Sequence, residues 1–325
     1  MRRLSNFLLV VAALVCAQAG IAYAQGNYPN RSIQLVVTVP PGGAADFVAR
    51  LIGAKLADAL GQPIVISNRA GAGGITAAAA VAKSEPDGYT LLLSTIATHG
   101  IGPHIYANPG YDPVKDFSPV ILIVKLPLVM AVNAEVPART VNGVIALAKA
   151  RPGQLSFSSA GSGGAPHLAG EMFKRFTATN LLHVPYRGSA PAVVDLIAAR
   201  ITMMFDATPV FLPHIESGKL RALAAASPQR HRLLPDVPSF AEVGYPGMDI
   251  ALWYGVAVPG GTPAPIVQRL NAELVKILDM PDIRKSLADQ GGDAQGGTTE
   301  DFAAFMRRES ARWAAVVKQA GIKPE

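Results

Sequence analysis

The chain has 325 residues, of which 50% are hydrophobic and 16% charged, and it carries a formal net charge of +6. The positive charge is spread along the sequence rather than gathered in a dense basic block, which argues against nucleic acid as a partner. About 300 residues exceed what one hydrophobic core usually fills, so we expect two domains.

The first 24 residues have the layout of a secretory signal peptide. Arg2 and Arg3 give a positive start, residues 7–16 are apolar, and small residues lead to a predicted cleavage site after Ala24. The apolar stretch is too short to span a membrane comfortably, so an uncleaved anchor is disfavoured. Cleavage would remove Cys16, the only cysteine, together with two arginines, and would lower the charge from +6 to +4. We therefore expect a periplasmic protein without disulfides.

The next segment alternates between strand and helix patterns. Apolar, β-branched runs predict strands, and apolar residues at helical spacing predict helices between them. Gly61 is expected to end the first of these helices as its C-cap residue. This alternation is typical of a parallel sheet covered by helices. The predicted strands are 33–39, 64–67 and 89–93, and the helices are 46–60 and 74–84.

The middle of the chain repeats this order, and the C-terminal region is mostly helical. Residues 120–132 look like a strand that leaves one sheet and enters another, and residues 250–258 look like its return. Two crossings imply one discontinuous domain (25–125 with 249–325) and one continuous domain (126–248). The further strands are 155–158, 181–184 and 201–205, and the helices are 141–150, 165–176, 191–199, 263–278, 282–290 and 299–320, the last with Thr299 as a candidate N-cap.

Two glycine-rich turns, each joining a strand to a helix, are the candidate ligand site. In α/β sheets such turns lie outside the carboxyl ends of the strands, where ligands bind. A helix start presents unpaired N–H groups and a partial positive charge, and glycine lets a ligand approach the backbone. One such turn alone is read as a simple turn, but two of them predict a site for the two ends of a dianion. The residues are Pro41, Gly42, Gly43, Ala44 and Ala45 in the first turn and Ser159, Ala160, Gly161, Ser162 and Gly163 in the second.

Five side chains near predicted strand ends are further candidates. Ser94 and Thr95 offer hydroxyl donors, and Tyr186 follows a strand. His167, in the first turn of its helix, either reaches the solute or bonds to the loop backbone. Asp206 either faces the solute, where it would prefer a donor group, or caps the following helix.

Three other residues have competing interpretations. We expect Asp46 to cap its own helix, because a carboxylate facing an anion would repel it. Trp253 and Tyr254, at the predicted return strand, form either a wall of the cleft or packing between the domains.

Enzyme signatures are mostly missing. The sequence contains no G-x-S-x-G elbow, no P-loop and no HExxH motif, and its histidines lack metal-ligand spacing. We expect no metal, no cofactor and no catalytic residue. An enzyme that uses His167 or Asp206 is the less favoured alternative.

Several segments together resemble the Bug family, the solute receptors of tripartite tricarboxylate transporters. The resemblance implies a type II periplasmic-binding-protein fold, with two α/β domains joined by crossing strands around a cleft. It also implies a small carboxylate ligand held between the two turns, partly through ordered water, and membrane permease subunits as partners of a monomer. Val39 departs from the family, which has an aromatic residue there, and a sensor kinase is an alternative partner. The segments are 33–46, 61–74, 86–91, 111–120, 183–188, 218–223, 235–238 and 261–263.

Overall fold

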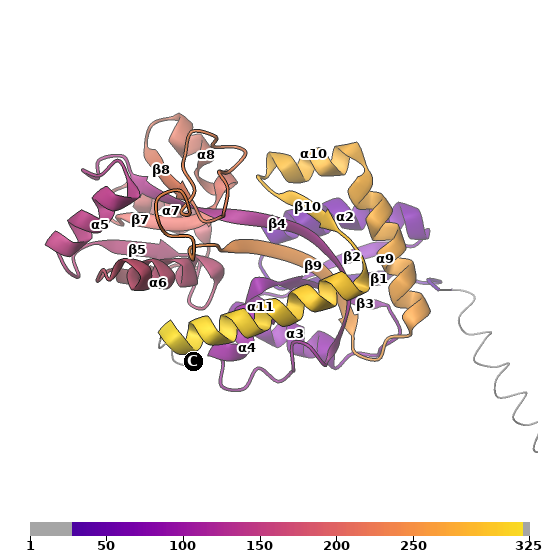
Figure 1. Ribbon diagram of the computed structural model, residues 1–325. Coiled ribbons are helices and arrows are strands. Elements are labelled where there is room, and N and C mark those ends of the chain that lie inside the picture. Colours follow the sequence, from indigo (N-terminus) through magenta and orange to yellow (C-terminus); the bar gives the residue numbers. More distant parts are fainter. Residues whose placement is uncertain (1–27, 321–325) are drawn as a thin grey trace, which may run out of the picture.

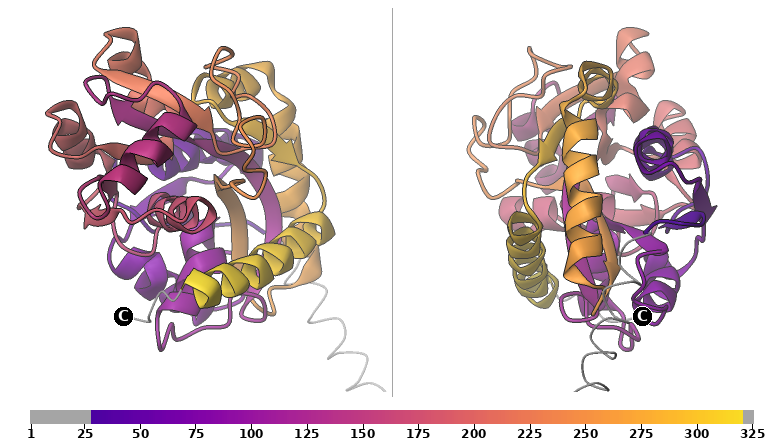
Figure 2. Two further views of the ribbon diagram at one scale, coloured as in Figure 1. Left: turned by 60° about the vertical axis from the view of Figure 1, so that its left-hand side comes forward. Right: turned by 90° about the vertical axis from the view of Figure 1, so that its right-hand side faces the viewer.

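The structure is a computed structural model that describes residues 28–320, with mixed α/β architecture (Figure 1). The predicted signal peptide and its cleavage site lie outside the described residues. The strands form one continuous, strongly bent sheet in the order β2-β1-β3-β9-β4-β7-β5-β6, and β8 and β10 pair with β4 beside this path. Helices pack on both sides of the sheet, as the three views show (Figure 2).

One end of the sheet contains the parallel strands β1, β2 and β3, joined antiparallel to β9. Helix α2 ends where Gly61 adopts a left-handed conformation (φ +66°) and donates its N–H to the Ala57 carbonyl, which confirms the predicted C-cap. The elements are β1 (Ile33–Val37), α2 (Ala44–Leu60), β2 (Ile64–Asn68), η1 (Ala72–Gly74), α3 (Ile75–Ala82), β3 (Thr90–Thr95), η2 (Ile96–Ile101), α4 (Gly102–Ile105), β9 (Ala251–Pro259), α9 (Ala264–Asp279), α10 (Pro281–Asp289), β10 (Asp293–Gly296) and α11 (Thr299–Ala320).

Strand β4 (Phe117–Asn133) connects the two ends of the sheet, as predicted for residues 120–132, and is longer than the prediction by three residues at its start and one at its end. Up to Pro127 it pairs with β9 and β10, and from Leu128 onward it pairs with β7 and β8. The change of partners falls within two residues, so β4 passes directly from one set of strands to the other (Figure 1).

The other end of the sheet contains parallel β5, β6 and β7, with β7 and β8 antiparallel to β4. All the predicted elements of this region are present, with ends shifted by two residues or fewer. Strand β8 was not predicted. The elements are α5 (Val141–Ala150), β5 (Ser156–Ser159), α6 (Ala165–Thr177), β6 (Leu182–Pro185), α7 (Ser189–Ile197), β7 (Met203–Ala207), α8 (Thr208–Glu216) and β8 (Leu220–Ala225).

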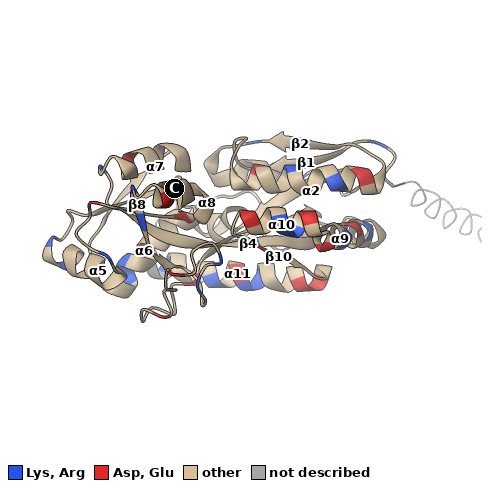
Figure 3. Cartoon of the chain, turned by 90° about the horizontal axis from the view of Figure 1, so that it is seen from above, with Lys and Arg blue, Asp and Glu red and all other residues tan. Residues whose placement is uncertain are grey.

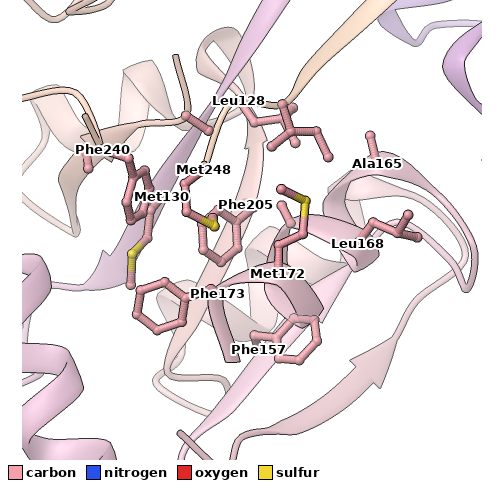
Figure 4. Close-up of a cluster of buried hydrophobic side chains, with 14 of the residues drawn as sticks. Leu128, Met130, Phe157, Ala165, Leu168, Met172, Phe173, Phe205, Phe240 and Met248 are labelled. Atoms are coloured by element: carbon pink, nitrogen blue, oxygen red, sulfur yellow. The ribbon is translucent and has the colours of Figure 1, made fainter. Parts of the chain in front are cut away.

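A cluster of buried hydrophobic side chains joins α6 to the sheet (Figure 4). Phe157 in β5 lies under α6, and a methyl group on Gly170 would come within 2.1 Å of its ring. Glycine at this position therefore lets the helix backbone approach the ring, and an alanine there would have to push the helix away. The same cluster extends to α11 through Phe305 and Trp313, so packing links both ends of the sheet.

Charged residues of both signs are interspersed over the surface helices, as on α10 and α11 (Figure 3). This arrangement agrees with the absence of a basic block in the sequence. None of the helices within residues 28–320 combines the length and the apolar character needed to cross a membrane.

The last helix begins differently from the prediction. Thr298, not Thr299, caps α11: its hydroxyl accepts the Asp301 N–H at 3.1 Å, and the Asp301 carboxylate accepts the Thr298 N–H at 3.0 Å. Both threonines precede an acidic first turn, so the sequence alone does not separate them, and the reciprocal bond to Asp301 selects Thr298.

Candidate functional site

The first glycine-rich turn lies between β1 and α2. Gly42 has φ +91°, a conformation that favours glycine, while Gly43 has φ −89° and is the N-cap of α2. Pro41, Gly42 and Gly43 are exposed, and no atom lies within 4 Å of where a side chain on either glycine would begin. The backbone of this turn and the start of α2 are therefore open to a ligand.

Asp46, in the first turn of α2, binds this glycine-rich turn through its carboxylate. Its carboxylate accepts hydrogen bonds from the Gly42 N–H at 3.0 Å and from the Asn68 amide and Arg50 guanidinium, each at 2.9 Å. The bond from Arg50, with those from Gly42 and Asn68, lowers the pKa of Asp46 to about 2 although burial opposes this. The expected cap is thus corrected in detail: Asp46 binds an amide of the turn before the helix, and its charge is neutralised by Arg50.

The loops that follow β2 and β3 meet this turn. A side chain on Gly74 would lie 2.6 Å from Thr38 and 3.2 Å from Thr98. The Thr95 hydroxyl accepts the Thr98 N–H at 3.2 Å and so caps the helical segment that follows β3. Ser94 is fully buried, and no described residue bonds to its hydroxyl. The turn, Ser94 and Thr95 therefore share one edge of the sheet, as predicted for strand ends.

The second glycine-rich turn is stabilised by its own hydrogen bonds. The Ser159 hydroxyl donates to the Gly161 carbonyl at 3.0 Å and lies 2.8 Å from Nε2 of His183. Because its single proton goes to Gly161, Nε2 of His183 carries a proton and donates to Ser159. The Gly163 N–H donates to Nδ1 of His167 at 3.0 Å. Of the two alternatives for His167, the structure contains the bond to the loop backbone.

Two imidazole rings stack beneath this turn. The centroids of His167 and His183 are 3.9 Å apart, and the ring of Phe157 stacks with His183 at 4.8 Å. Burial, with smaller effects from His167 and Lys174, lowers the pKa of His183 to about 4. His183 is therefore neutral at pH 7 and able to serve as the donor to Ser159. Sequence reasoning did not single out His183, since 24 residues separate it from its serine.

Asp206 lies at the end of β7, beside the second turn. Its Oδ2 accepts the Ser189 hydroxyl at 2.6 Å and its Oδ1 accepts the Ala207 N–H at 2.8 Å. Gly188, which precedes Ser189, donates its N–H to the Ala160 carbonyl at 3.1 Å. The ends of β5, β6 and β7 thus converge. Asp206 does not cap α8, whose N-cap residue is Ala207.

The three remaining aromatic candidates, Tyr186, Trp253 and Tyr254, each contact a different part of the fold. The Tyr186 hydroxyl donates to Asp195 at 2.6 Å, within the same part of the fold. Trp253 is 1% exposed and donates its indole N–H to Glu309 in α11, so it packs inside the protein rather than lining an open wall. Tyr254, 6% exposed, is the neighbour of Thr95 across β3 and β9.

A surface hollow of about 550 Å³ lies elsewhere, at the amino ends of β1 and β3. Its lining includes Arg31, Gln34 and Tyr89, with Arg31 held by Asp87 at 2.8 Å and stacked on Tyr89 at 4.0 Å. It contains none of the candidate site residues. Among residues 28–320, no group of three His, Cys, Asp or Glu side chains is arranged to hold a metal ion.

The fold and the two turns define an α/β solute-binding protein. Residues 48–322 match the tripartite tricarboxylate transporter family receptor. The chain is 39% identical to the BugT protein of Bordetella pertussis over 319 residues, which cover 97% of this chain and 98% of that one. The chain therefore belongs to the tripartite tricarboxylate transporter receptor family, a family of periplasmic solute-binding receptors, as the resemblance to Bug proteins implies.

Solved structures agree with this assignment. A Rhodopseudomonas palustris protein determined with adipate has a TM-score of 0.85 and 38% identity, over 92% of this chain and all of the other. The protein MatC from the same organism, determined with malate, has a TM-score of 0.81 and 34% identity, over 89% of this chain and all of the other. The predicted fold class, a periplasmic-binding-protein fold, is confirmed.

Proposed function

We propose that this receptor captures a small carboxylate between two domains and delivers it to the permease subunits of a tripartite tricarboxylate-type transporter, as a monomer and without chemical change. The observation that carries the proposal is the exposed start of α2 behind Gly42 and Gly43, matched by a second glycine-rich turn before α6. Each turn presents a helix start whose backbone N–H groups favour an anion.

The internal bonds of the two turns support this function. Asp46 forms an ion pair with Arg50, which neutralises its charge, so Asp46 does not repel an anion at the first turn. Ser159, His167 and His183 hold the second turn in shape before a ligand arrives, and a site that needs little reorganisation binds more tightly. The relatives determined with adipate and malate indicate that this fold accepts small dicarboxylates.

We further propose the domain boundaries expected from the sequence: 25–125 with 249–325, and 126–248. The change in the partners of β4 between Pro127 and Leu128 supports a boundary within two residues of the proposed one. The ligand contacts would come from the turn at Pro41–Ala45 with Ser94 and Thr95 on one side, and from Ser159–Gly163 with His167, Tyr186 and Asp206 on the other. Export with cleavage after Ala24 completes the proposal.

Isothermal titration tests the proposal. The full chain is expressed in a Gram-negative host, recovered from the periplasm, unfolded and refolded to remove bound solute, and titrated with mono-, di- and tricarboxylates. We expect micromolar or tighter binding of at least one carboxylate, because a few charge-assisted hydrogen bonds contribute about 1.5–3 kcal/mol each. No detectable binding of any carboxylate, together with tight binding of a sugar or a cation, would contradict the proposed function. Mass spectrometry of the released solute should show it unchanged, whereas conversion would indicate an enzyme.

A further inference from the structure

Asp206 is a buried carboxylate without a cationic partner. Its exposed fraction is 4%, and no Lys, Arg or His of residues 28–320 contributes to the pKa of its carboxyl. Its two hydrogen bonds come from neutral groups, the Ser189 hydroxyl and the Ala207 N–H. An ionised carboxylate accepts about four hydrogen bonds, so each oxygen of Asp206 keeps a free acceptor position.

The hydrogen-bond partners of Asp206 connect it to the second glycine-rich turn of the candidate site. Ser189 is the first residue of α7, and Gly188 before it binds Ala160 of the second glycine-rich turn. On the side of β9, the negative charge of Asp206 helps to raise the pKa of Tyr254, after the larger effect of burial. No hydrogen bond joins the Tyr254 hydroxyl to another residue in 28–320. The charge of Asp206 therefore acts on the Tyr254 hydroxyl from within electrostatic range.

We propose that Asp206 selects solutes that carry a hydrogen-bond donor, a hydroxyl or an ammonium group, on the carbon chain next to a carboxylate. This inference rests on the proposed function and names the substrate class within it. A buried carboxylate without a counter-charge is costly, and a donor on the solute offsets that cost. A solute with only methylene groups there leaves the carboxylate without a further partner and is rejected, because an unmade buried hydrogen bond costs more than a made one contributes.

The opposite arrangement, a solute carboxylate placed directly against Asp206, is disfavoured by charge. Two carboxylates in contact cannot both stay ionised, so such binding would require the uptake of a proton. The two glycine-rich turns offer N–H groups for the solute carboxylates at no such cost. Asp206 is therefore assigned to the part of the solute between or beside its carboxylates.

The test compares matched trios of dicarboxylates of four, five and six carbons: unsubstituted, 2-hydroxy and 2-amino. They are titrated calorimetrically at pH 7.5 into the full-length gene product recovered from the periplasm, as wild type and as Asp206→Asn. Asparagine fits the pocket, since its oxygen accepts the Ala207 N–H and its amide donates to Ser189, but it loses the acceptor that faces the solute. We expect a substituted acid to bind the wild type at least about 10-fold more tightly than its unsubstituted counterpart. The comparison of the hydroxy and amino acids shows which donor is used.

In Asp206→Asn the preference should fall to about threefold or less. Asp236→Asn, which removes the same charge from an exposed position of the same region, is the matched control and should keep the wild-type preference. Equal or tighter binding of the unsubstituted acids by the wild type overturns the inference and leaves the carboxylate receptor standing. A preference retained in Asp206→Asn also overturns it. Failure of all nine acids overturns the inference, and failure of every mono-, di- and tricarboxylate as well contradicts the receptor function itself.

Discussion

The carboxylate of Glu309 in α11 accepts the indole N–H of Trp253 in β9 at 3.1 Å, and it also accepts the indole N–H of Trp313 at 3.0 Å. One side chain thus satisfies two buried donors and ties the last helix to the strand at the crossing. Glu309 is itself 12% exposed, and its nearest cation is Arg312 at 3.6 Å.

Removal of this carboxylate should destabilise the protein. Glu309→Ala leaves two indole N–H groups buried without an acceptor, and we expect a loss of about 2–4 kcal/mol in the free energy of unfolding. Glu309→Gln retains an oxygen acceptor and should lose less. Urea denaturation followed by tryptophan fluorescence measures both. Glu216→Ala, at an exposed position in α8, is the control, and an effect of Glu309→Ala no larger than that of the control would contradict the role.

Large side chains at the two glycine-rich turns should leave the fold intact but weaken the binding of the ligand. Gly43 and Gly164 are the N-caps of α2 and α6 with φ of −89° and −84°, so leucine fits their backbone, unlike at Gly42 and Gly163, where φ is +91° and +77°. Gly43→Leu and Gly164→Leu should weaken carboxylate binding by 10-fold or more, because the side chain covers the helix start, with little effect on the midpoint of unfolding. Calorimetry measures the binding.

The matched control for these variants is Ala264→Leu, which adds bulk at the exposed first residue of α9. Wild-type affinity is expected there. Unchanged affinity in both glycine variants would mean that the ligand site lies elsewhere.

Regular elements could be predicted because their local patterns are strong. Helix 141–150 has the predicted ends, and the change of partners along β4 follows from an apolar run too long for one sheet. Strands β8 (LRALAA) and β10 (DAQG) escaped prediction, because neither has β-branched residues or apolar alternation, and their pairing with β4 decides their conformation.

The glycine-rich turns of the site were predictable, but the contacts that hold them were not. A turn with glycines between a strand and a helix is recognised from sequence alone. The bond from His183 to Ser159 and the approach of Gly74 to Thr38 depend on how neighbouring strands pair, which no local pattern encodes. For His167 the sequence allowed two roles, and the bond from the Gly163 N–H is the one that the structure contains.

The neutral state of His183 should make folding sensitive to acid. Its pKa is lowered to about 4 in the folded protein, from an unfolded value of 6.5, first by burial and then by His167 and Lys174. Below pH 6.5 His183 is protonated in the unfolded chain but stays neutral in the folded protein. The contribution of neutral His183 to the free energy of unfolding is therefore present above pH 6.5 and is lost as the pH falls towards 4. His183→Asn should therefore show a smaller fall in stability between pH 7 and pH 5 than the wild type, as measured by urea denaturation. Equal decreases in the free energy of unfolding for the two proteins would contradict the lowered pKa of His183.

Asp206 should have the opposite pH dependence. Burial raises its pKa to about 6 from 3.8, although the bonds from Ser189 and Ala207 act against this. Between pH 3.8 and 6 the folded protein binds a proton that the unfolded chain has released, so the stabilising effect is full below pH 3.8 and is lost as the pH rises through 6. Asp206→Asn removes this dependence and should gain stability relative to the wild type as the pH rises from 5 to 7.5. No relative gain would show that the carboxylate is ionised at little cost.

Ligand binding should bring the two proposed domains together. Contacts between them include an ion pair, Arg232 with Asp293 at 3.6 Å, the approach of Gly163 to Ile105, and the buried apolar cluster that extends from α6 to α11. A solute that bonds to both glycine-rich turns favours the closed arrangement of the domains because it binds that arrangement more tightly than an open one. Small-angle scattering should show a smaller radius of gyration with a saturating carboxylate than without it, and Gly43→Leu should not respond to the same concentration. An identical profile for the free and the bound wild type would mean that the protein binds its solute without closing.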